Sequence, residues 1–442
     1  MDPKNRPSQL GADAAPRRGR AARRARRHGG AEDGPSPPRR GFGGWIALWG
    51  PILATSLFAA VLYHNVISIY AKRKFGGDIS GLLCIGDYKW PERILPAATW
   101  IHRHTPGYDG QFHYLIAQDL LATSDVVRYV DNPAYRYQRI LYPALAAMAA
   151  HGDLPSLPAA MFWVNLLAVA ATTGLLALML RRRARSPWLA LVYPLFGGLM
   201  LATLRDLTEP TALFFLVLSL HCYLEARVLP AAAALAAAIL GRETLLAMVP
   251  VLALDALVRR RDRRAALLLC GAVVPFALWA VYLHSQFGAW GLAVGERVFA
   301  TPGVAVWAYA RDLFAETLRA APRLPERWLL VSTALEADRT YFVLLALALA
   351  ASLGVGLRTL RRGPSGITVG LIGFTVMPLL MSDLVWRGEV WSFGRVQVLS
   401  QTLLLIHFIE RRDLLALVPL GLHAASTAWL LDRLDILKRL VA

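Results

Sequence analysis

The feature that most limits the fold of this chain is a series of apolar runs separated by short charged connections. A helix that crosses the apolar core of a bilayer needs about 20 residues, and most of the runs approach that length. Hydrophobic residues make up 56% of the chain and the mean hydropathy is +0.43, which excludes an ordinary soluble domain. The sequence therefore predicts an all-α, polytopic transmembrane bundle of about 10–12 spans. The runs lie at residues 43–64, 158–180, 187–203, 210–226, 229–257, 265–284, 341–358, 365–382, 396–410 and 413–431.

Two stretches depart from a simple span. The run 229–257 is interrupted by Gly241-Arg242-Glu243-Thr244, and charges at mid-bilayer are costly unless they face a wet cavity, so we expect two short crossings to meet there. Residues 137–150 are apolar but short for a crossing. We expect a re-entrant or interfacial helix, with a full span as the alternative.

The positive charge is concentrated at one end of the chain. The net charge is +18, and residues 1–40 place many arginines among Gly, Pro and Ala. Such a segment buries too little apolar surface to fold, so 1–40 is predicted to be a disordered basic tail, with residues 41–442 as the transmembrane domain. The tail lacks the interleaved aromatics of a nucleic-acid-binding arm and directly precedes a span. It therefore indicates a cytoplasmic N-terminus beside anionic membrane lipids, with no nucleic-acid partner.

The connections sort into two kinds when the tail is placed inside. The internal connections are short and rich in arginine, as at 181–185, 259–264, 361–362 and 411–412. The external ones, chiefly the long first loop 65–157 and a second interval 285–340, mix acids, cations, Trp and Tyr, as in short helices at the headgroup level. We therefore expect the chemistry on the external face of a multi-pass integral membrane protein.

Asp109 is the candidate catalytic residue of the first loop. It follows Tyr108 and precedes a stretch with helical spacing through Tyr114, Gln118 and Leu121. At a helix start the macrodipole keeps a carboxylate ionised, and an ionised carboxylate can accept a proton from a hydroxyl. The alternative is that Asp109-Gly110 is only a turn.

A family resemblance rests on two segments, Tyr108-Asp109-Gly110-Gln111-Phe112-His113-Tyr114-Leu115-Ile116-Ala117 and Arg139-Ile140-Leu141-Tyr142-Pro143. They resemble the first external loop of GT-C superfamily glycosyltransferases, especially glycosylphosphatidylinositol mannosyltransferases and bacterial cell-surface glycopolymer formation proteins. The resemblance implies an inverting enzyme of the bacterial plasma membrane whose site faces the periplasm, with Asp109 as general base. It implies a polyprenyl-phosphate sugar donor and a cell-surface glycan, glycolipid or protein acceptor. Tyr108, in place of Trp, and Gln111 depart from the mannosyltransferase pattern, so the sugar is not carried over.

A phosphate leaving group needs cations aimed at its developing charge, and arginine binds phosphate through two donors. Arg205 and Arg242 each have an acid nearby in the sequence, Glu209 and Glu243, so local ion pairs that hold helix ends together are the alternative. Tyr108, Gln111, His113, Glu209 and Glu243 complete the predicted substrate-binding set. The arginine candidates are Arg136, Arg139, Arg205, Arg242, Arg387 and Arg395.

Other chemistries find little support. His102, His104 and His113 beside Asp109 raise the question of a metal, but the first two histidines would still need two more ligands, so we predict no metal and no cofactor. Phosphate loops, dinucleotide fingerprints and nucleophile elbows are missing from the sequence. Two alternatives remain: a transporter or flippase for a lipid-linked glycan, and a non-catalytic glycopolymer assembly factor.

Overall fold

The structure is a computed structural model that describes residues 42–88, 95, 99–293, 300–320, 328–382, 386 and 394–434. The chain divides into two units, Met1–Trp49 and Gly50–Ala442. The predicted disordered tail 1–40 lies outside the described residues.

The described residues are helical and form no strand beyond one isolated bridge between Gly86 and His102. The first half contains α1 (Phe42–Phe75), η2 (Ile79–Leu83), α2 (Asp109–Gln118), η4 (Asp125–Tyr129), α3 (Pro133–Arg136), α4 (Leu141–Ala149), α5 (Leu157–Arg182), η5 (Pro187–Leu195), α6 (Gly197–Leu204) and α7 (Glu209–Leu224). The second half contains α8 (Val228–Gly241), η6 (Glu243–Ala247), α9 (Met248–Val258), α10 (Arg263–Gly271), α11 (Val274–Phe287), α12 (Val304–Ala320), α13 (Trp328–Arg362), α14 (Gly366–Val376), η8 (Met377–Leu380), α17 (Val398–Arg411), η9 (Leu414–Ala416) and α18 (Leu417–Arg433).

The prediction of an all-α bundle with membrane-length helices is confirmed. By length and composition, five helical segments in the described part of the chain could cross a membrane, or six if the pair η5 and α6, bent by 57°, counts as one broken span. This is fewer than predicted, because α7, α8 and α14 with η8 are apolar but shorter. The five are Trp49–Phe75, Leu157–Arg182, Arg263–Phe287, Arg339–Arg362 and Leu414–Asp432.

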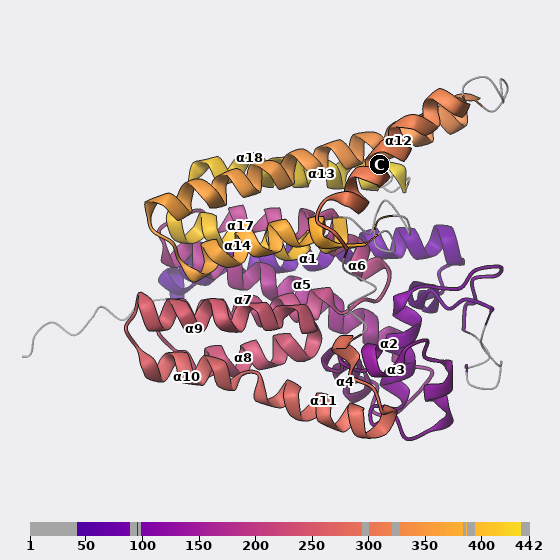
Figure 1. Cartoon of the computed structure of the whole chain (residues 1–442), viewed down its shortest axis with the longest axis horizontal. Coiled ribbons are helices and arrows are strands. Elements are labelled where there is room, and N and C mark those ends of the chain that lie inside the picture. Colours follow the sequence, from indigo (N-terminus) through magenta and orange to yellow (C-terminus); the bar gives the residue numbers. More distant parts are fainter. Residues whose placement is uncertain are drawn as a thin grey trace, which may run out of the picture. The chain divides into compact units, whose positions relative to one another are not determined.

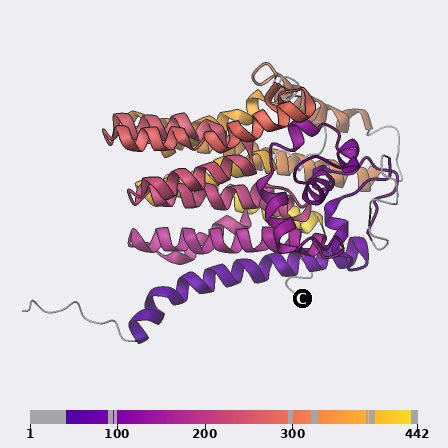
Figure 2. The same cartoon turned by 90° about the horizontal axis from the view of Figure 1, so that it is seen from below.

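Helices that follow one another pack side by side in much of the bundle. Helix α7 packs against both α5 and α8, α9 against α10 and α14, and α14 against α13 and α17, while α18 lies along α13. In both views the long helices run nearly parallel, and α2, α3 and α4 gather at one end of them (Figure 1, Figure 2). The short helices α2, α3 and α4 of the first loop thus lie together at one end of the bundle.

The break predicted inside the run 229–257 is present. Helix α8 stops at Gly241, Arg242 is extended, and η6 leads into α9. The short apolar stretch 137–150 contains only α4, whose nine residues span about 14 Å at 1.5 Å per residue. This helix is therefore too short to cross a bilayer and forms part of the first loop.

Three boundaries differ from the sequence prediction. Helix α1 continues to Phe75, because the cations Lys72, Arg73 and Lys74 in its last turn suit the negative end of the helix dipole. The first loop therefore begins near 76 and not at 65. The interval 285–340 is likewise not one surface segment: α11 reaches Phe287, and α13 is one continuous helix from Trp328 to Arg362.

Candidate functional site

The start of α2 is held in a fixed position by the loop around it. Tyr108 is the extended residue before the helix, and its N–H donates to the carbonyl of Cys84 over 2.9 Å. Gly110 is pressed against the Arg205 carbonyl, since a Cβ there would lie 2.3 Å from that oxygen. The Gln111 amide accepts from the N–H of Gly86 and donates to the carbonyl of Pro106. Asp109 is the first residue of α2, as predicted.

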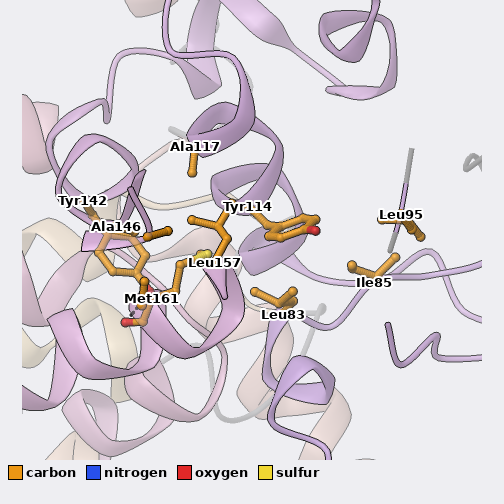
Figure 3. Close-up of a cluster of buried hydrophobic side chains, with 11 residues drawn as sticks. Leu83, Ile85, Leu95, Tyr114, Ala117, Tyr142, Ala146, Leu157 and Met161 are labelled. Atoms are coloured by element: carbon orange, nitrogen blue, oxygen red, sulfur yellow. Dashed lines mark hydrogen bonds between the residues drawn. The ribbon is translucent and has the colours of Figure 1, made fainter. Parts of the chain in front are cut away.

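An apolar cluster fixes the opposite face of α2. Tyr114 and Ala117 pack among Leu83, Tyr142 and Met161, which come from η2, α4 and α5 (Figure 3). Burial of such side chains gives about 1.5–3 kcal/mol each. The helix is therefore clamped by its apolar face, and its N-terminal carboxylate is presented at a defined point.

Two arginines bind the Asp109 carboxylate. Arg136 Nη1 lies 2.8 Å from Oδ1, and Arg395 Nη1 lies 3.1 Å from Oδ2. Arg136 also holds both oxygens of Asp131, at 2.8 and 2.9 Å. Burial raises the pKa of Asp109, but Arg136, Arg395 and Arg139 outweigh it and hold the pKa well below its usual range. Asp109 is therefore ionised at neutral pH.

The ion pairs continue from Arg395 to the interior. Arg395 Nε lies 3.0 Å from Glu209 Oε1, and Arg242 Nη1 lies 2.5 Å from the same oxygen. We call the series Asp131, Arg136, Asp109, Arg395, Glu209 and Arg242 the charge row. It links η4–α3, α2, the segment before α17, α7 and the α8–α9 break.

Glu209 and Glu243 pair across elements, whereas the alternative reading of the sequence had local pairs that hold one helix end together. Glu209 pairs with Arg242 and Arg395, while Glu243 receives two hydrogen bonds from Arg139, at 2.7 and 2.8 Å. The acids pair across elements because the break between α8 and α9 meets both α7 and the first loop. The ion pairs therefore join distant parts of the chain and do not merely close one helix end.

A cavity of 240 Å³ opens beside Asp109. Its lining includes four aromatic rings along with Asp131, Arg136 and Gln111. The Arg136 guanidinium lies 4.4 Å from the centre of the Phe112 ring, a cation–π distance. Aromatic faces beside polar groups suit a sugar ring, which has apolar C–H faces and polar edges. The four rings belong to Tyr88, Tyr108, Phe112 and Tyr129.

The remaining predicted residues have different surroundings. The Arg205 guanidinium lies 3.1 Å from Cys84 Sγ and 5.4 Å from the centre of the Tyr108 ring, so it borders the site. His113 is buried against Tyr142, and burial lowers its pKa to about 3. It is therefore neutral at pH 7 and brings no charge to a phosphate. Arg387 lies outside the described residues.

Sequence reasoning missed three members of the site: Asp131, Tyr88 and Tyr129. Asp131 stands five residues before Arg136, a nearby acid that could have been paired with it. Tyr88 and Tyr129 lie well before and well after the Asp109 motif in sequence. Asp206 is fully buried with the Tyr142 hydroxyl 3.3 Å from Oδ1, and burial raises its pKa to about 8.

Within the described residues, no group of three His, Cys, Asp or Glu side chains is arranged to hold a metal ion. No protein-family model, curated protein or solved structure matches this chain.

Proposed function

We propose that this protein is a membrane glycosyltransferase that moves a sugar from a polyprenyl-phosphate donor to a cell-surface glycan, glycolipid or protein. Asp109 is the general base that takes the proton of the acceptor hydroxyl. The observation that carries the proposal is the position of this carboxylate, which is at once ionised, fixed at a helix start and exposed to an aromatic-lined cavity.

The charge of the site supports a phosphate-bearing donor. The charge row and the Arg139–Glu243 pair bring four arginines to the Asp109 end of the bundle, and Arg205 borders them. A polyprenyl-phosphate sugar is a phosphodiester with one negative charge, and this charge doubles when the sugar leaves. Arginines that are already in place can stabilise that developing charge without reorganisation.

The same arginines explain how the base is activated. A carboxylate that is held by two guanidiniums is a weak base, because both stabilise its ionised form. In the proposed mechanism the donor phosphate takes over Arg395 and part of Arg136, which weakens their hold on Asp109. The basicity of Asp109 then rises only when the donor is bound.

The connections at the two ends of the bundle support one orientation of the protein. We place the charge row on the periplasmic face of a bacterial plasma membrane, since the opposite end carries the arginine-rich turns around 181–185, 259–264, 361–362 and 411–412. Lys72, Arg73 and Lys74 at the end of α1 run against this sorting. They are outnumbered by the arginines at the other end.

The test is Asp109→Asn in the full chain, reconstituted in membranes and supplied with a panel of polyprenyl-phosphate sugars. Loss of a general base should slow transfer by about 10²–10⁴-fold while donor binding is kept. The matched control is Asp125→Asn, an acid of the same loop that is 76% exposed and paired with Arg128; its activity should be unchanged. If the protein were a flippase or an assembly factor, the Asp109→Asn variant should keep full activity in a cell-surface glycan assay. That result would refute the proposal.

A further inference from the structure

A second charged cavity lies at the other end of helix α17. This helix starts three residues after Arg395 and ends at Arg411, so the two sites are separated by its length. The cavity has a volume of 450 Å³ and is formed where α13 ends, α17 ends and η9 begins. That volume is within the range of small-ligand sites, about 300–1,000 Å³.

The lining of this cavity is strongly basic. Four arginines, Arg358, Arg362, Arg411 and Arg412, face one carboxylate, Asp413. Arg358 Nη1 lies 3.9 Å from Asp413 Oδ1, which is a loose pair. Three positive charges are therefore in excess around one hollow, and an anion is the complementary ligand.

The donors of the cavity are only partly used by the protein. Arg411 donates through Nη2 to the Gly363 carbonyl over 2.8 Å, while its Nε is buried without a hydrogen-bond partner in the described part of the chain. A buried donor without a partner costs about 1–3 kcal/mol. An oxyanion bound in the cavity would supply the missing acceptor.

Exposed apolar side chains lie beside the arginines of this cavity. Leu414 and Leu415 line the cavity, and they are 68% and 49% exposed. Leu357 and Leu360 near the end of α13 and Val418 at the start of α18 are also exposed. A free phosphate would have no use for this surface, whereas the acyl chains of a lipid would cover it.

We propose that this cavity binds the headgroup phosphate of an anionic phospholipid, with the acyl chains against the exposed leucines. Basic pockets between transmembrane helices are suited to such headgroups. The bound lipid would tie the end of α13 to that of α17, and α17 leads back to the Arg395 segment. This inference does not depend on the glycosyltransferase assignment.

The test compares lipid binding by the purified full chain in neutral detergent, by native mass spectrometry with phosphatidylglycerol and with phosphatidylcholine as probes. The variant is Arg358→Gln with Arg362→Gln. The matched control is Arg263→Gln with Arg264→Gln, which removes the same charge from two exposed arginines at the start of α10. If the double variant fails to fold, Arg362→Gln against Arg264→Gln makes the same comparison.

We expect the wild type to bind phosphatidylglycerol more tightly than phosphatidylcholine. The cavity variant should bind phosphatidylglycerol at least about tenfold more weakly than the wild type, a loss of about 1.4 kcal/mol. The affinity of the control variant should stay within about twofold of that of the wild type. Equal losses in variant and control would mean diffuse attraction by the whole basic face and would overturn the proposal. Soluble glycerol phosphate is the competitor. Displacement of the lipid by glycerol phosphate at equal concentration would also overturn it, because the acyl chains would then contribute nothing.

Discussion

The Arg139–Glu243 pair allows a quantitative test of how the site is held together. It joins the first loop to the break between α8 and α9, and its two side chains are only 5% and 8% exposed. The substitution Glu243→Met removes the acceptor of two hydrogen bonds and leaves a guanidinium buried without its counter-ion. Breaking a buried pair in this way costs about 3–5 kcal/mol, far more than the median surface pair, which gives about 0–1 kcal/mol.

The double variant distinguishes the interaction between the two side chains from the interactions that each makes with other residues. Arg139→Met with Glu243→Met removes both charges, and replacing a buried pair by apolar side chains is often neutral. The costs of the two single variants should therefore not add. We expect a coupling energy of about 2–3 kcal/mol between the two positions.

The assay is the free energy of unfolding in mixed micelles, from titration with SDS followed by tryptophan fluorescence. Asp125→Asn is the control, because its pair with Arg128 spans a similar 3.1 Å but is exposed to water; it should cost less than about 1 kcal/mol. Two results would refute the view that this pair is buried away from water. One is a loss of unfolding free energy in Glu243→Met as small as that of the control, and the other is a double variant whose loss equals the sum of the two single losses.

Two further predictions concern Asp206 and Gly110. Burial raises the pKa of Asp206 in the folded state to about 8, from 3.8 for an exposed carboxyl group. The folded state therefore keeps a proton that the unfolded state loses, and stability falls as pH rises between these values, by up to about 1.4 kcal/mol per unit. Asp206→Asn should therefore gain stability over the wild type from pH 5 to pH 8 in the same titration, and a constant difference would contradict the reasoning. Gly110→Ala should destabilise by about 1–3 kcal/mol because its Cβ meets the Arg205 carbonyl. Gly271→Ala, with open space around its Cβ, should be neutral or slightly stabilising, and equal costs for the two glycines would count against the tight contact.

The sequence predicts the helical class and the position of Asp109 because both rest on local signals. Apolar runs of membrane length form helices whatever they pack against, and Asp109 follows an extended Tyr108 at the start of an amphipathic stretch. The break at Arg242 was also predictable, since charges interrupt an apolar run. The end of α1 was not, because its last turn is cationic and carries no apolar signal.

The pairing of the charges could not be read from the sequence. Proximity along the chain favoured Arg205 with Glu209 and Arg242 with Glu243, yet the structure pairs Arg242 with Glu209 and brings Arg139 to Glu243 from more than a hundred positions away. Ion pairs form between side chains that the packing of helices brings together, and that packing is a property of the whole bundle. Apart from Asp131, the sequence thus identifies the charged residues of the site without their partners.

The contact between Asp109 and Arg395 bears on how such a protein is made. The two residues are separated by 286 positions, so a chain emerging from the ribosome inserts α1 through α14 before the second guanidinium exists. Until then Glu209 and Asp109 both lack the ion pair that Arg395 makes with them in the folded protein. Truncations that end before α17 should accordingly be judged as half-built intermediates of biogenesis, and not as smaller working versions of the protein.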